Sequence, residues 1–318
     1  ILLLMTNQNS KGIIFILIAM ALFSIQDALI KFIYNEVALF ELYFGRIFIG
    51  LILLCGYLIL TKKNIVLKTH YPFLTTLRVL LHFFGFSFFF ISLTFMSLAM
   101  ANALFFSSPF FVSILAIIFL KEKMGLRRWF AIFIGFIGVY IVLDPNFNDF
   151  KIINLTPIMC ALCYAISMII TKITSDKDNV YTQIIHLYIG GLAICILIFI
   201  LSGKGQFNNF NDPTLQFVFR EWFSNVSYSW PFIFIMGVFA CIAFYCVFSA
   251  YSIASPSLVS LFEYSLIIWS IIMGYFLFKE IPTIQTFLGA ILIISAGIYI
   301  YIREKVKNQI IASNTPNR

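Results

Sequence analysis

The sequence predicts an all-α integral membrane protein with ten transmembrane helices. Hydrophobic residues make up 62% of its 318 residues and charged residues only 11%, whereas soluble domains are about half apolar and a quarter charged. The apolar residues gather in ten runs, each close to the roughly 20 residues that a helix needs to cross a hydrocarbon core about 30 Å thick. An isolated strand would leave unpaired backbone groups in lipid, so each run is expected to be a helix.

Short polar segments separate the runs, and prolines mark several boundaries. Pro72, Pro157, Pro231 and Pro282 lie at or near predicted helix starts, where the missing N–H costs least. Pro109 lies well inside a run and should bend or locally open that helix. The predicted helices cover residues 12–33, 38–60, 72–93, 98–119, 127–143, 154–172, 181–201, 230–251, 256–278 and 283–302.

A repeated hairpin predicts that the chain is built twice from one plan. Residues 102–145 hold two apolar runs joined by the charged turn KEKMGLRR, and a weaker copy spans 254–302. If the N-terminus is cytoplasmic, that side carries 14 Lys and Arg and the opposite side carries five, so both termini are predicted to be cytoplasmic. With five helices in each half, the second repeat is then inverted across the membrane. The predicted parts are an N-terminal tail (1–11), a first repeat (12–143), a linker (144–153), a second repeat (154–302) and a C-terminal tail (303–318).

Two further segments each leave a choice open. The long loop at 202–229 contains PTLQFVFREWF, which fits either a short helix at the membrane interface or an ordinary outer loop. Cys160 and Cys163 form a C-x-x-C motif, but they lie on a predicted spanning helix with no further ligands at metal spacing. We interpret them as small packing residues, and we predict no metal and no cofactor.

Ionisable groups inside a membrane are costly to bury, so each one is a candidate site residue. At 1.5 Å per residue, Asp27 and Arg46 lie at similar depths in the outer half of their helices. Arg78 and Glu263 lie at similar depths in the inner half. We expect one ion pair above and one below a midplane cavity, and the alternative is that both pairs are static and only fix the register of the helices.

Weaker candidates complete the predicted site. Asn102 is a weaker polar candidate, and His82 and Pro109 lie near the middle level, beside the expected cavity. Four aromatic residues lie beside the polar candidates and would stack on a flat or cationic solute, although packing alone explains them equally well: Phe106, Tyr245, Tyr264 and Trp269. Lys31 is close enough to the outer interface to reach it, and is expected to be an anchor.

Several segments, taken together and in order, resemble a known family. They are SIQDALIK at 24–31, the arginines in FELYFGRIFIG and LRVLLHFFGFSFFF, the block from Ala101 to Trp129, GFIGVYIVLDP, and FEYSLIIW followed by LFKE. The chain resembles the drug/metabolite transporter superfamily, and within it the ten-helix EamA-like branch. The acid in the first helix and the Glu-Tyr pair in the ninth are similar to the subgroup of bacterial S-adenosylmethionine and riboflavin uptake carriers.

This resemblance implies a central cavity lined by helices 1, 3, 4, 6, 8 and 9. The residues that it places on the cavity are Asp27, Arg78, His82, Asn102, Ser107 and Glu263. Glu122 and Glu280 match the acidic residues that end helices 4 and 9, and we assign them to structure. The chain departs from the branch at Ile267, which stands where Pro109 stands in the first half, and this puts the symmetry of the two halves in doubt.

The sequence therefore predicts a secondary active transporter that works by alternating access in the bacterial inner membrane. Two acids and two arginines in the predicted cavity favour a zwitterionic metabolite such as an amino acid or S-adenosylmethionine. Uptake of a flat heterocycle such as riboflavin, or export of amino acids or toxic metabolites, are the alternatives. Protons are a candidate coupling ion, through Asp27, Glu263 or His82, and a homo-oligomer is left open.

Other classes of protein fit the sequence less well. An intramembrane metalloprotease needs a cluster such as H-E-x-x-H, but the three histidines, His70, His82 and His186, are scattered. A channel would offer rings of identical groups around a pore. We therefore predict that the protein is not an enzyme, that its partners are the lipid bilayer and a small solute, and that it binds no nucleic acid.

Overall fold

The computed structural model describes residues 2–122, 125–143 and 152–281, together with scattered positions between 283 and 299. Within these residues all regular structure is helical and no strand occurs. The helices are α1 (Leu2–Ile33), α2 (Leu39–Leu60), α3 (Pro72–Ser92), α4 (Leu98–Phe105), α5 (Ser108–Leu120), α6 (Leu126–Leu143), α7 (Thr156–Thr174), α8 (Val180–Ser202), α9 (Pro213–Phe219), α10 (Val226–Ile253), α11 (Pro256–Phe262) and α12 (Ser265–Phe278), with a 3-10 turn, η1 (Ile152–Leu155).

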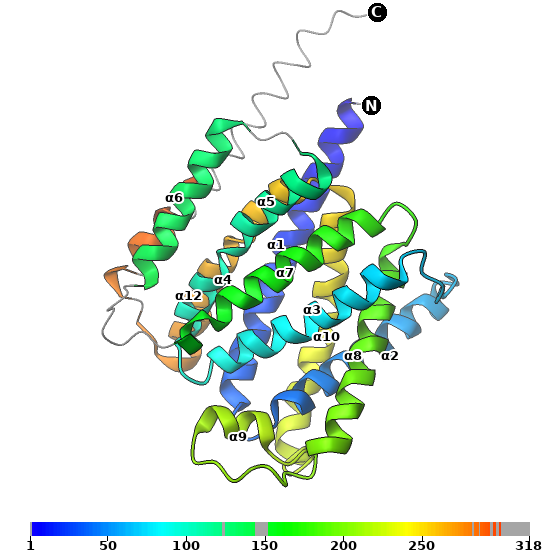
Figure 1. The fold of residues 1–318 in the computed structure, drawn as a ribbon, viewed down its shortest axis with the longest axis vertical. Helices are drawn as coiled ribbons and strands as arrows, with labels where there is room; N and C mark the ends of the chain where they lie inside the picture. Colours follow the sequence, from blue (N-terminus) through cyan, green and yellow to red (C-terminus); the bar gives the residue numbers. More distant parts are fainter. Residues whose placement is uncertain are drawn as a thin grey trace, which may run out of the picture.

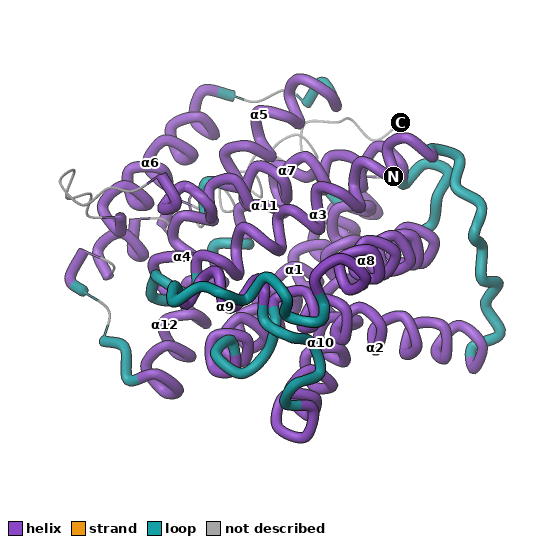
Figure 2. Tube along the Cα trace, turned by 60° about the horizontal axis from the view of Figure 1, so that its bottom comes forward, coloured by secondary structure: helices purple, strands orange, loops and turns teal. Residues whose placement is uncertain are grey.

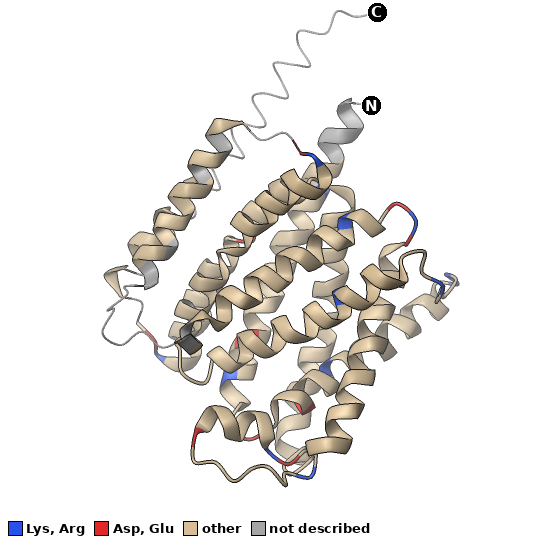
Figure 3. Ribbon diagram, viewed as in Figure 1, with Lys and Arg blue, Asp and Glu red and all other residues tan. Residues whose placement is uncertain are grey.

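The helices agree with a protein that crosses the membrane many times. Eight of the described segments are long and apolar enough to span a bilayer, and Figure 1 shows them gathered into one bundle. Figure 3 shows that the charged residues lie mostly at helix ends and in loops. The all-helical membrane fold is therefore confirmed. The predicted helix at 283–302 lies largely outside the described residues, so the number ten stays a prediction.

Two of the predicted helices are broken in the middle. The predicted helix 98–119 divides into α4 and α5 at Phe106–Ser107, and Pro109 lies in the first turn of α5, which confirms that this proline opens the helix. The predicted helix 256–278 divides into α11 and α12 at Glu263–Tyr264. No proline occurs at this second break. The helix is broken there even though Ile267 stands where Pro109 stands in the first half.

Helix α1 lies at the centre of the bundle and packs against α10 and α12, while α3 packs against α7 (Figure 1). Helices α2 and α10 approach closely because each offers a glycine to an isoleucine of the other. A Cβ atom on Gly45 would lie 2.4 Å from Ile233, and a Cβ atom on Gly237 would lie 2.6 Å from Ile49. Small residues of this kind allow helices in membranes to pack tightly.

Two long connections join helices of the bundle, one between α2 and α3 and the other between α8 and α10. Figure 2 shows the long extended connection between α2 and α3 running along the outside of the bundle.

The loop at 202–229 contains the short helix α9. The Asp212 carboxylate caps this helix by accepting the backbone N–H of Thr214 and of Leu215. Arg220 ties this loop to the turn after α1 by donating to the carbonyls of Tyr34, at 2.8 Å, and Val37, at 3.0 Å. Of the two alternatives for the loop, the short helix is the one observed.

Candidate functional site

A cavity of about 110 Å³ lies among helices α1, α2, α3, α4, α7, α10 and α12. Its walls are mostly aromatic and aliphatic, and a few polar groups converge on it. Its lining residues are Met20, Phe23, Asp27, Arg46, Leu81, His82, Gly85, Phe86, Phe89, Phe90, Asn102, Phe105, Cys160, Tyr164, Met168, Phe244, Val247 and Leu266. Four of the predicted site residues are among them: Asp27, Arg46, His82 and Asn102.

Arg46 is held against the cavity wall by aromatic rings. Its guanidinium carbon lies 4.6 Å from the centre of the Phe86 ring and 5.5 Å from that of Phe244, and Nη1 donates to Gln26 Oε1 at 3.3 Å. Asp27 lines the same cavity, but the expected ion pair with Arg46 is not formed within 4 Å. The acidic side chain and the basic side chain therefore face one space without direct contact.

Several buried polar atoms at the cavity have no hydrogen-bond partner among the described residues. They are Arg46 Nε, His82 Nε2 and Asn102 Oδ1. The amide of Asn102 is oriented by a hydrogen bond from Nδ2 to the Leu98 carbonyl at 3.1 Å, and the His82 ring meets Phe244 edge-on at 4.9 Å. Since buried polar groups are normally paired, three free ones around a single cavity indicate a place for a polar solute.

Arg78 is fully buried but does not line this cavity. Its Nη1 donates to Gln183 Oε1 at 2.6 Å and to Thr174 Oγ1 at 3.2 Å, so it faces the ends of α7 and α8. The expected pair between Arg78 and Glu263 is therefore not formed, because the two side chains point to different neighbours. Depth along a helix sets the height of a side chain but not the direction in which it points.

Glu263 is fully buried at the break between α11 and α12. Its Oε1 accepts the hydroxyls of Tyr251 at 2.5 Å and Tyr164 at 2.7 Å, and its Oε2 accepts Ser108 Oγ at 3.3 Å. Ser108 begins α5, so this carboxylate joins the two broken helices. Tyr164 lines the cavity, so the Tyr164 side chain lies between Glu263 and the cavity. Tyr164 was not among the predicted site residues, because a single tyrosine in an apolar run carries no distinguishing signal.

The other predicted residues lie outside the cavity lining. Ser107 donates to the Leu104 carbonyl at 2.9 Å, next to Pro109 at the break. Tyr264 is buried edge-on against Phe106 at 5.5 Å, and Tyr245 stacks on Tyr181 at 5.6 Å. Trp269 is 39% exposed, as expected for a side chain that faces lipid.

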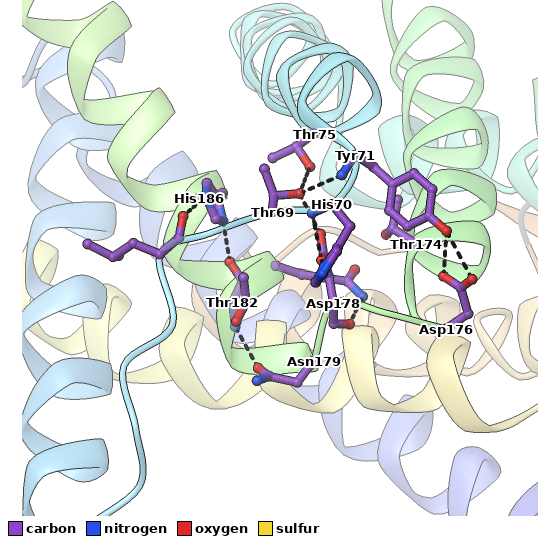
Figure 4. Close-up of polar contacts among 12 residues, drawn as sticks. Thr69, His70, Tyr71, Thr75, Thr174, Asp176, Asp178, Asn179, Thr182 and His186 are labelled. Carbon is purple, nitrogen blue, oxygen red and sulfur yellow. Dashed lines mark hydrogen bonds and ion pairs between the residues drawn. The ribbon is translucent and has the colours of Figure 1, made fainter.

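A second polar cluster holds the connection before α3 against the turn between α7 and α8 (Figure 4). Asp178 Oδ2 accepts Thr69 Oγ1 at 2.5 Å, and Oδ1 accepts the His70 backbone N–H and meets the His70 ring, both at 3.0 Å. Burial opposes ionisation of Asp178, but the hydrogen bonds from Thr69 and His70 outweigh it and hold the pKa of the carboxyl below its usual value. This cluster is outside the spans and lies next to the residues that hold Arg78.

Replacing Asp178 by asparagine should destabilise the protein at pH 7 by about 1.5–3 kcal/mol, because hydrogen bonds to a charged group are lost. The lowered pKa means that this contribution is present above the pKa of the unfolded state, about 3.9, and is lost as the pH falls through the still lower pKa of the folded state. Thermal unfolding of both proteins in detergent from pH 7 to pH 3 measures the difference. A difference that stays constant over this range would contradict the role of the charge.

Neither a metal nor a disulfide is indicated in the part of the chain that the structure describes. No group of three or more His, Cys, Asp or Glu side chains there has metal-binding geometry. The six cysteines are free, including Cys160 and Cys163.

Comparison with known proteins agrees with this architecture. The EamA-like transporter family matches residues 10–144 and again residues 151–302. The chain is 28% identical to the S-adenosylmethionine uptake transporter of Rickettsia prowazekii, over 93% of this chain and 94% of that one. It is 27% identical to the riboflavin transporter of Vibrio cholerae, over 65% of this chain and 63% of that one. It is also 22% identical to the pseudopaline exporter of Pseudomonas aeruginosa, over 91% and 95%.

A solved crystal structure has the same fold, with a TM-score of 0.68 and 15% sequence identity over 92% of this chain and 96% of the other. The double family match covers most of the chain, and the relatives named above are transporters or exporters. The protein is therefore a multi-pass membrane transporter that belongs to the EamA-like family of the drug/metabolite transporter superfamily.

Proposed function

We propose that the protein is a secondary active transporter for S-adenosylmethionine or a closely similar zwitterion. The observation that carries this proposal is the pair of opposite charges, Asp27 and Arg46, which line one mostly aromatic cavity without forming an ion pair. A solute with separated positive and negative groups satisfies both charges. The identity to S-adenosylmethionine uptake transporters over nearly the whole chain supports the same solute class.

Each part of S-adenosylmethionine has a chemical counterpart in the cavity wall. The ammonium and sulfonium groups are cations that suit Asp27, and the carboxylate suits Arg46 and the free Nε of its guanidinium. The adenine ring is flat and suits the faces of Phe86, Phe105 or Phe244. Asn102 Oδ1 remains to accept an N–H group of the solute.

The proposal includes alternating access between two inverted repeats. At about 110 Å³, the cavity is smaller than the 300–1,000 Å³ of pockets that hold drug-sized ligands, so the helices must separate to admit the solute. We assign the repeats to residues 12–143 and 154–302, which agree closely with the two family matches. The excess of Lys and Arg on one side favours cytoplasmic termini in a bacterial inner membrane.

Riboflavin is the second candidate solute. Six phenylalanines in the cavity wall offer stacking surface for a flat ring system: Phe23, Phe86, Phe89, Phe90, Phe105 and Phe244. Riboflavin is uncharged at neutral pH, however, and leaves Asp27 and Arg46 without counter-charges. Burying charged groups beside a neutral solute is unfavourable, so we place riboflavin second.

Uptake into proteoliposomes tests the proposal. We expect saturable uptake of radiolabelled S-adenosylmethionine that unlabelled S-adenosylmethionine abolishes and riboflavin does not, with protein-free liposomes as the control. Thermal stabilisation of the purified protein by S-adenosylmethionine measures binding independently of transport. If riboflavin alone is taken up and alone raises the unfolding temperature, the zwitterion proposal is wrong.

We further propose that Glu263 carries a coupling proton. Its carboxylate is fully buried, has no cationic partner within 4 Å among the described residues, and is joined through Tyr164 to the cavity. Burying a lone negative charge is costly, so protonation of Glu263 is favoured in any state that keeps it from water. A state that opens the break between α11 and α12 would favour release of the proton.

A further inference from the structure

Two lysine–glutamate sets occupy equivalent positions in the two halves of the chain. Lys31 lies two residues before the end of α1, and Lys172 lies two residues before the end of α7. Glu122 lies two residues after the end of α5, and Glu280 lies two residues after the end of α12. The chain therefore carries the same two-residue arrangement twice, with one lysine and one glutamate in each half.

The turns that carry the two glutamates have the same backbone geometry. Lys121 and Lys279, the residues before them, both adopt the left-handed conformation, with φ of 53° and 57°. In each turn the backbone N–H of the glutamate donates to the carbonyl six residues earlier, at 3.2 Å for Glu122 and 3.1 Å for Glu280. A left-handed residue directly after the last helical residue is a common way for a helix to end, and here it fixes where the backbone of each glutamate lies.

The two lysines also bind equivalent backbone groups. Lys31 Nζ donates to the Met96 carbonyl at 3.3 Å, and Lys172 Nζ donates to the Ala254 carbonyl at 3.0 Å. Met96 and Ala254 each lie 26 residues before the glutamate of their own half. Each lysine is therefore anchored two residues before the broken helix of its own half, α4–α5 for Lys31 and α11–α12 for Lys172.

The two sets differ in whether the charges meet. Lys31 Nζ lies 2.5 Å from Glu280 Oε1, so this end carries an ion pair between the two halves. Glu122 instead accepts the hydroxyls of Ser255, at 2.9 Å, and Ser257, and it forms no ion pair with Lys172. Lys172 and Glu122 nevertheless bind adjacent residues, Ala254 and Ser255. We call the Lys31–Glu280 set closed, because its lysine and glutamate form an ion pair, and the Lys172–Glu122 set open, because they do not.

The closed and open sets lie at opposite ends of the bundle. Gly12, near the start of α1, lies against Ala254, the residue whose carbonyl Lys172 binds. Lys31 follows 19 residues later on the same helix, about 28 Å away at 1.5 Å per residue. Figure 1 likewise shows α1 and α7 ending at opposite ends of the bundle.

We propose that the two sets are alternating latches, so that Lys172 pairs with Glu122 in the opposite state of the transport cycle while Lys31 separates from Glu280. This rests on the proposed alternating access. Both pairs join the first half of the chain to the second, so each closes its own end of the pathway. Because one pair forms as the other breaks, the exchange leaves the number of ion pairs unchanged and lets a carrier pass between two states of similar free energy.

Charge reversal tests the latch that is open in this structure. In proteoliposomes we expect Lys172→Glu and Glu122→Lys each to lower uptake of S-adenosylmethionine at least 10-fold, and the double variant Lys172→Glu/Glu122→Lys to recover most of it. Lys177→Glu, which makes the same charge change on the exposed turn after α7, should retain normal uptake. A double variant no better than the single variants would overturn the proposal, because residues that never meet cannot rescue each other.

Cross-linking provides a readout that needs no substrate. The Cys pairs K31C/E280C and K172C/E122C are treated with a short bifunctional maleimide, and intact mass is compared with the wild type and with each single-Cys variant. Both pairs should cross-link, the second more slowly. A K172C/E122C pair that reacts no more than its single variants contradicts the latch. If the wild type takes up no S-adenosylmethionine but K172C/E122C cross-links, the substrate proposal fails and the latch stands.

Discussion

Replacing Glu263 by leucine should destabilise the transporter by about 3 kcal/mol or more, since the buried hydroxyls of Tyr164, Tyr251 and Ser108 lose their acceptor. Replacing it by glutamine should leave stability near that of the wild type. The glutamine oxygen can accept both tyrosine hydroxyls, and its NH₂ group can donate to the Ser108 oxygen. Thermal unfolding in detergent compares the three proteins.

The glutamine variant separates the structural role of Glu263 from its proposed role as a proton carrier. It keeps the hydrogen bonds but cannot take up or release a proton. Uptake of S-adenosylmethionine by this variant should therefore be independent of an imposed pH gradient, whereas uptake by the wild type should follow the gradient. If the gradient drives the glutamine variant as well as it drives the wild type, Glu263 carries no coupling proton.

Neutralising either Asp27 or Arg46 in the cavity wall should also have a large effect, in this case on which solute the protein binds. We expect Asp27→Asn and Arg46→Gln each to weaken binding and uptake of S-adenosylmethionine by about 30-fold or more, which corresponds to about 2 kcal/mol for one charged contact. Neither change should weaken binding of a neutral flat solute. Binding by thermal shift and initial uptake rates in proteoliposomes measure both effects.

Trp269→Ala provides the matched control for the cavity variants. Trp269 was also a candidate from the sequence, but it is 39% exposed and does not line the cavity, so its removal should change uptake less than twofold. Normal uptake of S-adenosylmethionine by both Asp27→Asn and Arg46→Gln would show that the solute does not contact these charges.

The sequence predicted much of the fold because the physical signal was strong. A spanning helix needs a long apolar run, and eight such segments are found among the described helices. The polar cavity residues Asp27, Arg46, His82 and Asn102 were found for a related reason, because a polar group at membrane depth is costly and rarely incidental. Both inferences need only the position of a residue along its own helix.

Predictions that depended on how helices face one another succeeded less often. The pairing of Arg78 with Glu263 was wrong because the rotation of each helix about its axis is set by packing, which one sequence does not reveal. The ion pair of Lys31 with Glu280, a residue 249 positions away, was not predicted, and the expectation that Lys31 is an interface anchor stays a prediction. The stacking phenylalanines could not be selected from 39 in the chain. The second break, at Glu263–Tyr264, was not predicted because no proline occurs there.

The two helix breaks have a consequence for how selectivity can evolve in this transporter. Asn102 and Phe105, which line the cavity, belong to α4, whereas Glu122 lies two residues after the end of α5. The break at Phe106–Ser107 interrupts the helix between these two segments. Substitutions on α4 can then change which solute is recognised without altering the opening machinery at the end of α5. Such modularity suits a family whose members are named for solutes as different as S-adenosylmethionine, riboflavin and pseudopaline.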